Sequence, residues 1–210
     1  MWNSSIIRMS TGLINTVNDA VIGGSAGISG ASKFAGQLGA PIWIDDAALM
    51  YSSTIGTVYG GRFRYVRLAA AASAVARGQI VFWDISVADN LFQVTTVESG
   101  SVPGAQLRAG VVLNPNWTAG NYSFIQDVGP TYVKFRATLT AVPAGVGVSV
   151  YAAAAGAGAD NGLADVVNSA DPATFSDVGL LQNRYLGSAI ELPTNGGTKL
   201  VNLNLMNVRG

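Results

Sequence analysis

The chain has 210 residues, no cysteine and no histidine, and its 12 basic and 12 acidic residues give a net charge of zero. The lack of cysteine excludes disulfides and thiolate metal sites, and the lack of histidine removes the commonest general base and metal ligand. Charged residues make up only 11% of the chain, whereas an ordinary soluble domain has about 25%. We therefore expect part of its surface to contact other protein rather than water.

The first segment, residues 1–45, is rich in Gly, Ser, Ala and Asn, and the stretch 23–30 has too many glycines to hold a helix or strand by itself. Apolar side chains nevertheless recur along it, including Trp2, Ile6, Ile7 and Phe34. A purely solvated linker would not need them. We predict an extended N-terminal arm that lies on a partner. A short helix over about 11–21 and a disordered tail remain open as alternatives.

The amino-acid composition changes near Pro41, and residues 46–210 are predicted to form one β domain. Short runs of β-branched and aromatic residues alternate there with Gly, Pro, Asn and Asp, a pattern typical of strands and turns. The strand-like runs are 42–44, 49–51, 57–59, 62–68, 79–84, 92–97, 111–113, 121–126, 132–136, 175–181, 184–192 and 200–205. The alanine-rich stretch 68–76 favours helix by propensity, but it is short and lacks both an N-cap and a charged face. We expect no helix there.

The run Arg62, Phe63, Arg64, Tyr65 alternates strictly, which places two arginines on one face of a strand and two aromatic residues on the other. Arginines on a strand face, helped by Arg67, could bind nucleic-acid phosphates, but the chain has no net positive charge and no continuing basic run. Arginine is favoured at protein interfaces, so we predict that these arginines contact a neighbouring protein. A solvated strand face is the alternative.

The stretch Gly110–Gln126 predicts a strand, a turn at Asn-Pro-Asn, and a second strand. The segment Gly187–Leu203 is a weaker copy, with the same spacing between two glycines and again an enclosed proline. We expect these two related hairpins to frame the C-terminal half. Gly129 and Pro130 are predicted to make a turn between the first hairpin and the next strand.

The uncharged run 137–159 is long enough to cross a bilayer, but Pro, Gly, Ser and Thr interrupt it and its valines recur at the even spacing of a strand. We predict no membrane span. The segment 156–172 has few β-branched residues and is predicted to be a long loop. Within it, Asp160, Asn161 and Gly162 are predicted to form a tight turn rather than a calcium loop, because the later ligand positions are missing.

The sequence contains no phosphate-binding loop and no nucleophile elbow. Four carboxylates near predicted strand ends could pair for glycoside hydrolysis, although no spacing recommends them: Asp45, Asp84, Asp127 and Glu191. We therefore predict no catalytic, cofactor-binding or metal-binding residues and no small-molecule substrate.

Four stretches carry a resemblance to a known family: 61–68 (GRFRYVRL), 76–84 (ARGQIVFWD), 109–113 (AGVVL) and the hairpin 110–126. Together they resemble the small capsid decoration (cement) proteins of tailed bacteriophages. The resemblance covers roughly 60–126, extends weakly to the C-terminal copy and hardly includes the N-terminal segment. It implies strand, tight turn and strand over 68–84. The fold predicted overall is mainly β, a compact barrel or sandwich of short antiparallel strands behind the arm.

The resemblance also implies a function. The protein would be made in the cytoplasm of a bacterial host, join the virion as a homotrimer on the outer surface of an icosahedral capsid, and clamp neighbouring major capsid subunits, with neither nucleic acid nor membrane as a partner. The residues predicted to contact the capsid or a subunit are Trp2, Ile6, Ile7, Phe34, Arg62, Arg64 and Arg67. Two alternatives remain: a head-fibre or tail adhesin component, and a virion-associated glycan hydrolase.

Overall fold

A computed structural model describes residues 38–39, 41–44, 50–52, 56–70, 74–84, 92–96, 108–153, 160–166 and 184–205. In this part of the chain the fold is mainly β and contains no helix, as the sequence predicts. The predicted arm lies almost entirely outside the described residues, and so does the predicted strand 175–181.

The described residues form twelve strands. They are β1 (Pro41–Ile44), β2 (Met50–Ser52), β3 (Gly56–Val58), β4 (Gly61–Leu68), β5 (Ile80–Trp83), β6 (Gln93–Thr95), β7 (Arg108–Val112), β8 (Tyr122–Lys134), β9 (Ser149–Ala152), β10 (Ala164–Val166), β11 (Tyr185–Ala189) and β12 (Thr198–Asn204). Strands β2 and β3 form a small sheet of their own, and the other ten belong to one sheet.

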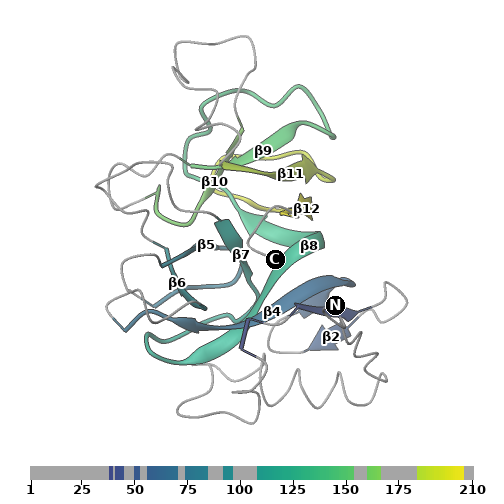
Figure 1. The fold of residues 1–210 in the computed structure, drawn as a ribbon. Helices are drawn as coiled ribbons and strands as arrows, with labels where there is room; N and C mark the ends of the chain where they lie inside the picture. The colour runs from purple at the N-terminus through teal and green to yellow at the C-terminus, as the bar shows by residue number, and fades with distance from the viewer. Residues whose placement is uncertain are drawn as a thin grey trace.

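Five strands of the large sheet close on themselves. In the order β4, β6, β5, β7, β8, each pairs with the next, and β8 pairs back with β4, so the strands form a small barrel. Strand β1 lies beside the first half of β4. The pairing of β4 with β6 is parallel and the other pairings of this barrel are antiparallel, so the sheet is mixed rather than wholly antiparallel. This barrel is the lower half of the molecule in Figure 1.

The upper half of Figure 1 is a second closed arrangement that uses the far end of the same strand, β8. Here β8 pairs with β12, which continues through β11 and β9 to β10. A bridge between Phe135 and Ala164, and a hydrogen bond from Arg136 N to Ala164 O at 3.0 Å, bring β10 back to the chain just after β8. One strand of 13 residues therefore holds both halves together.

The predicted turn at Gly129 and Pro130 is wrong, because both residues lie inside β8. The strand bends there instead: Gly129 has φ +98°, and a Cβ at this position would lie 2.6 Å from Gly60 O. The side-chain amide of Gln126 donates to Val128 O at 3.2 Å and to Pro130 O at 3.0 Å. Pairing with β12 continues across the bend, so the backbone hydrogen bonds of a turn are not needed.

Both predicted hairpins are present. Strands β7 and β8 pair through Val111 and Gln126, and β11 and β12 pair through Gly187 and Leu203. Because β8 and β12 are neighbours, the two hairpins lie side by side in one sheet. In the turn of the first hairpin, Trp117 is fully buried and donates its indole N–H to Asn121 O at 3.0 Å.

The described loops have only part of the structure that the sequence predicts for them. Val75 forms a bridge with Trp117, and none of the described residues of 68–76 is helical. The turn at 160–162 is confirmed, with φ +73° at Gly162. The loop predicted over 156–172 is wrong where β10 lies, because Ala164–Val166 are buried and pair with β9. In the described chain, no helix has the length and apolarity required to cross a membrane.

Candidate partner-binding surfaces

The alternation at the start of β4 places its side chains as predicted, with Arg62 and Arg64 on one face. Both arginines bind the carboxylate of Asp127 from β8: Arg62 Nε lies 2.8 Å from Oδ1, and Arg64 Nε lies 2.8 Å from Oδ2. The Asp127 side chain has no exposed surface, and those of Arg62 and Arg64 are 11% and 6% exposed. Asp127 sits at a β-bulge, where the register between β4 and β8 shifts.

The predicted contact residues do not form one surface. Arg64 is buried and also donates to Gly39 O at 2.9 Å, so its guanidinium is held largely by the chain itself. Arg67 lies on the opposite face of β4, where its guanidinium is 5.9 Å from the centre of the Tyr122 ring. The four predicted arm contacts, Trp2, Ile6, Ile7 and Phe34, lie outside the described residues. Partner contact by all seven residues stays a prediction.

Sequence reasoning missed four exposed apolar side chains on two loops of the upper half, which we call together the loop-tip patch: Val142 (94% exposed), Val146 (67%), Ile190 (42%) and Leu192 (47%). The valines lie between β8 and β9, and the other two lie between β11 and β12. Large apolar side chains grouped at a surface mark contact sites more often than single ones do. The even spacing of the valines had suggested a strand, but only Ser149–Ala152 form one.

Backbone hydrogen bonds hold the two loops of this patch side by side. Gly147 N donates to Ala189 O at 2.7 Å, and Ala189 N donates to Val148 O at 2.9 Å. Leu139 N donates to the side-chain oxygen of Asn195 at 3.0 Å, which ties the loops together a second time. The patch is therefore presented on a braced support.

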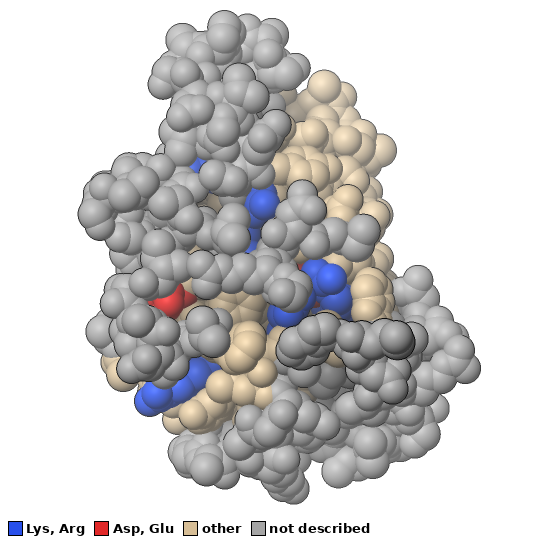
Figure 2. Space-filling model, in the orientation of Figure 1, with Lys and Arg blue, Asp and Glu red and all other residues tan. Residues whose placement is uncertain are grey.

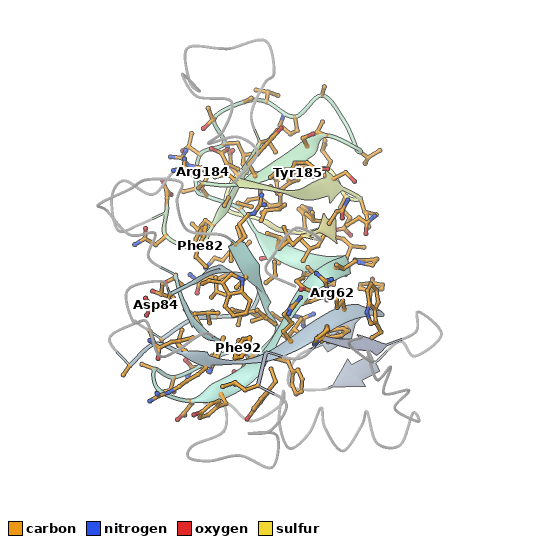
Figure 3. All side chains as sticks on the ribbon, viewed as in Figure 1. Arg62, Phe82, Asp84, Phe92, Arg184 and Tyr185 are labelled. Carbon is orange, nitrogen blue, oxygen red and sulfur yellow. The ribbon has the colours of Figure 1, made fainter. Side chains whose placement is uncertain are left out.

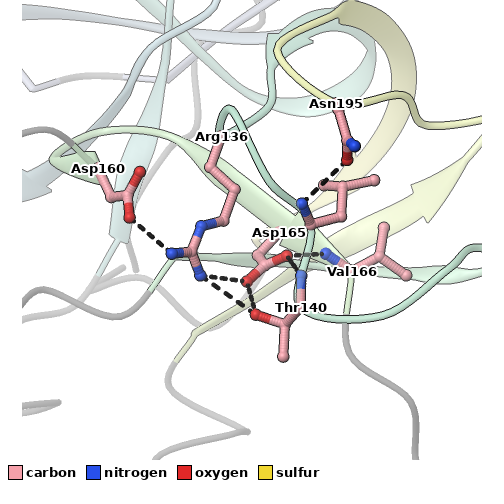
Figure 4. Close-up of polar contacts among 7 residues, drawn as sticks. Arg136, Thr140, Asp160, Asp165, Val166 and Asn195 are labelled. Carbon is pink, nitrogen blue, oxygen red and sulfur yellow. Dashed lines mark hydrogen bonds and ion pairs between the residues drawn. The ribbon is translucent and has the colours of Figure 1, made fainter.

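Figure 4 shows the polar network beneath the first of these loops. Arg136 pairs with Asp165 at 3.0 Å and with Asp160 at 2.7 Å. Asp165 also accepts from the backbone N–H of Thr140 at 2.9 Å and of Val166 at 2.8 Å. The hydrogen bond to Asp165 is the largest influence on Arg136 and raises the pKa of its guanidinium. Both carboxylate oxygens of Asp165 accept hydrogen bonds, so this side chain holds the loop after β8 against β10.

Other titratable groups are engaged in structural contacts. Burial lowers the pKa of Arg108 to about 10, and its guanidinium donates to Tyr185 O, which links β7 to β11. A hydrogen bond with Tyr59, followed by burial, raises the pKa of Tyr132. Burial is also the largest influence on Arg77, whose pKa it lowers.

The described carboxylates considered for catalysis each make structural contacts of their own. Asp127 is bound by two arginines, Asp84 accepts from Gln93 at 2.8 Å, and Glu191 accepts from the backbone at 3.0 Å. Asp45 lies outside the described residues. No group of three or more His, Cys, Asp or Glu side chains that could hold a metal occurs among the residues described.

No protein-family model and no curated protein matches this chain.

Proposed function

We propose that this chain is a structural virion protein that binds the outer surface of an icosahedral phage capsid and clamps neighbouring major capsid subunits. The observation that carries the proposal is the loop-tip patch. It presents four exposed apolar side chains on braced loops, in a chain with only 11% charged residues. The β-rich fold is compatible with the family resemblance of residues 60–126. The homotrimer and the contacts of the N-terminal arm belong to the same proposal.

The binding free energy available to one loop-tip patch favours a protein that binds through several linked copies. Burying a valine or leucine side chain completely contributes about 1.5–3 kcal/mol. Burial of Val142 and Val146 on binding would supply most of this free energy, because the two side chains are 94% and 67% exposed in the free protein. The braced loops lose little conformational freedom on binding, which preserves more of that gain. One patch alone binds weakly, but three patches linked in one homotrimer add avidity without any new contact.

Cosedimentation of the purified protein with empty heads that lack it tests the proposal. We expect the wild type to bind and V142S/V146S to bind at least tenfold more weakly, since about 1.4 kcal/mol changes an affinity tenfold. The exposed residue Asn202 on β12 supplies the control, N202S, which should bind like the wild type. Deletion of residues 1–37, which spares Gly39, should weaken binding and leave the β fold intact. Failure of the wild type to sediment with heads would refute the proposal. Full binding by V142S/V146S would show that the loop-tip patch does not contribute to capsid binding.

A further inference from the structure

The arginine network of β4 carries more positive than negative charge. Arg62 and Arg64 contribute two positive charges, and Asp127, the carboxylate that both bind, contributes one negative charge. Among the described residues, the remaining polar contacts of the two guanidinium groups are neutral backbone oxygens, Gly39 O for Arg64 and Leu205 O for Arg62 at 3.3 Å. An uncompensated charge in such a poorly solvated position is costly, and an anion that reached it would relieve the cost.

The geometry leaves donors for such an anion. Within the part of the chain that the structure describes, Arg62 Nη1 and Arg64 Nη2 make no hydrogen bond. Arg62 reaches the surface, with 11% of its side chain exposed. Figure 2 shows blue Lys and Arg atoms at the surface in the middle of the viewed face, and Figure 3 labels Arg62 at this position. Its guanidinium also lies 5.8 Å from the centre of the Trp43 ring, which is 43% exposed.

We propose that Arg62, with Arg64 behind it and Trp43 beside it, forms a binding site for a carboxylate, supplied by an Asp or Glu side chain of a protein partner. Guanidinium groups bind carboxylates through short, charge-assisted hydrogen bonds. A carboxylate carries one negative charge and balances the one excess positive charge, whereas a phosphate dianion would leave an excess of negative charge beside Asp127. Trp43 offers an apolar wall for the methylene groups of such a side chain. Only the identity of that partner as a capsid protein rests on the proposed function.

The site can be tested on the purified protein without capsids. Sodium acetate is titrated at constant ionic strength against sodium chloride, while NMR follows the indole N–H of Trp43 and the Nε–H of Arg64. We expect shifts that saturate in the wild type and are lost in R62Q. R62K, which keeps the charge but loses the planar donor group, should bind acetate at least threefold more weakly. R67Q is the matched control, because Arg67 lies on the other face of β4, and it should bind within twofold of the wild type.

Three results would overturn the proposal. Shifts that do not saturate, or that persist in R62Q, would show that acetate does not bind at Arg62. Saturation by inorganic phosphate at lower concentration than acetate would assign the site to phosphate instead. Tighter acetate binding by D45N/D46N would mean that the chain's own carboxylates, which lie outside the described residues, occupy the site. The spectrum of each variant shows whether it is folded, and the outcome does not depend on whether the protein binds heads.

Discussion

Replacement of Asp127 by Asn should destabilise the protein far more than the same replacement of Asp160. Both carboxylates pair with arginine at 2.7–2.8 Å, but the Asp127 side chain is fully buried and that of Asp160 is 28% exposed. Removing the carboxylate from a buried pair leaves uncompensated charge and costs about 3–5 kcal/mol. Counting two charge-assisted hydrogen bonds at about 1.5–3 kcal/mol each gives a similar range. The partly exposed pair of Asp160 with Arg136 should contribute only about 0–1 kcal/mol.

Urea unfolding followed by tryptophan fluorescence measures the difference, since Trp117 is fully buried in the folded protein. D127N should lower the free energy of unfolding by about 3–5 kcal/mol with an unchanged m-value, and D160N by no more than about 1 kcal/mol. For a chain of this size, D127N should also lower the Tm by roughly 6–20 °C. A difference between the two variants below about 1 kcal/mol would refute the reasoning, because burial would then not decide the strength of the pairs.

Three further predictions concern the bend at Gly129, the hydrogen bond between Tyr59 and Tyr132, and the carboxylate of Asp165 that holds the loop after β8. G129A should destabilise the protein by several kcal/mol more than G120A: both glycines have positive φ, but a Cβ at Gly129 would lie 2.6 Å from a backbone oxygen and one at Gly120 would meet nothing within 4 Å. Equal unfolding midpoints would contradict this. Y59F should lower the pKa of Tyr132 toward 10.0, as measured by NMR titration, since the hydrogen bond with Tyr59 is the main cause of its raised value. Because the folded pKa lies above the unfolded one, the stability this group contributes is present below about pH 10 and is lost as the pH rises through the folded pKa. D165A should speed amide hydrogen exchange in the loop after β8 while the β4–β8 amides stay protected, and unchanged exchange would show that this carboxylate does not hold the loop.

Local sequence signals predicted most of the described strands and both hairpins, because alternation and turn residues act over a few positions. The hairpin Gly110–Gln126 and its weaker C-terminal copy are examples. The bend at Gly129 and Pro130 was misread as a turn, since these two residues favour turns in general. Tertiary contacts keep them in one strand, because Gly60 packs against the bend and β12 pairs across it. The parallel pairing of β4 with β6 likewise leaves no local signal.

The candidate surfaces were less predictable than the fold. The alternation of Arg62 and Arg64 was read correctly, but their carboxylate partner lies 65 residues from Arg62 in the sequence, and no spacing rule connects the two. An available signal was an aspartate directly after the predicted strand 121–126, since a charged residue in a buried strand requires a partner. The loop-tip patch was hidden for a different reason. The valines after β8 fit a strand, and only the fold shows that two of them are exposed beside a second loop.

Strand β8 separates the two proposed surfaces. Arg62 and Arg64 bind Asp127 in the barrel half of β8, whereas the loop that carries Val142 and Val146 follows the other end of this strand. The arginine site and the loop-tip patch therefore belong to different halves of the molecule, and we expect them to meet different parts of a partner or different subunits. Because no hydrogen bond or ion pair of the described residues joins the two sites, the losses of binding free energy in R62Q and V146S should add in the double variant to within about 0.5 kcal/mol. A double variant that binds heads no more weakly than the worse single variant would mean that one surface acts only by supporting the other.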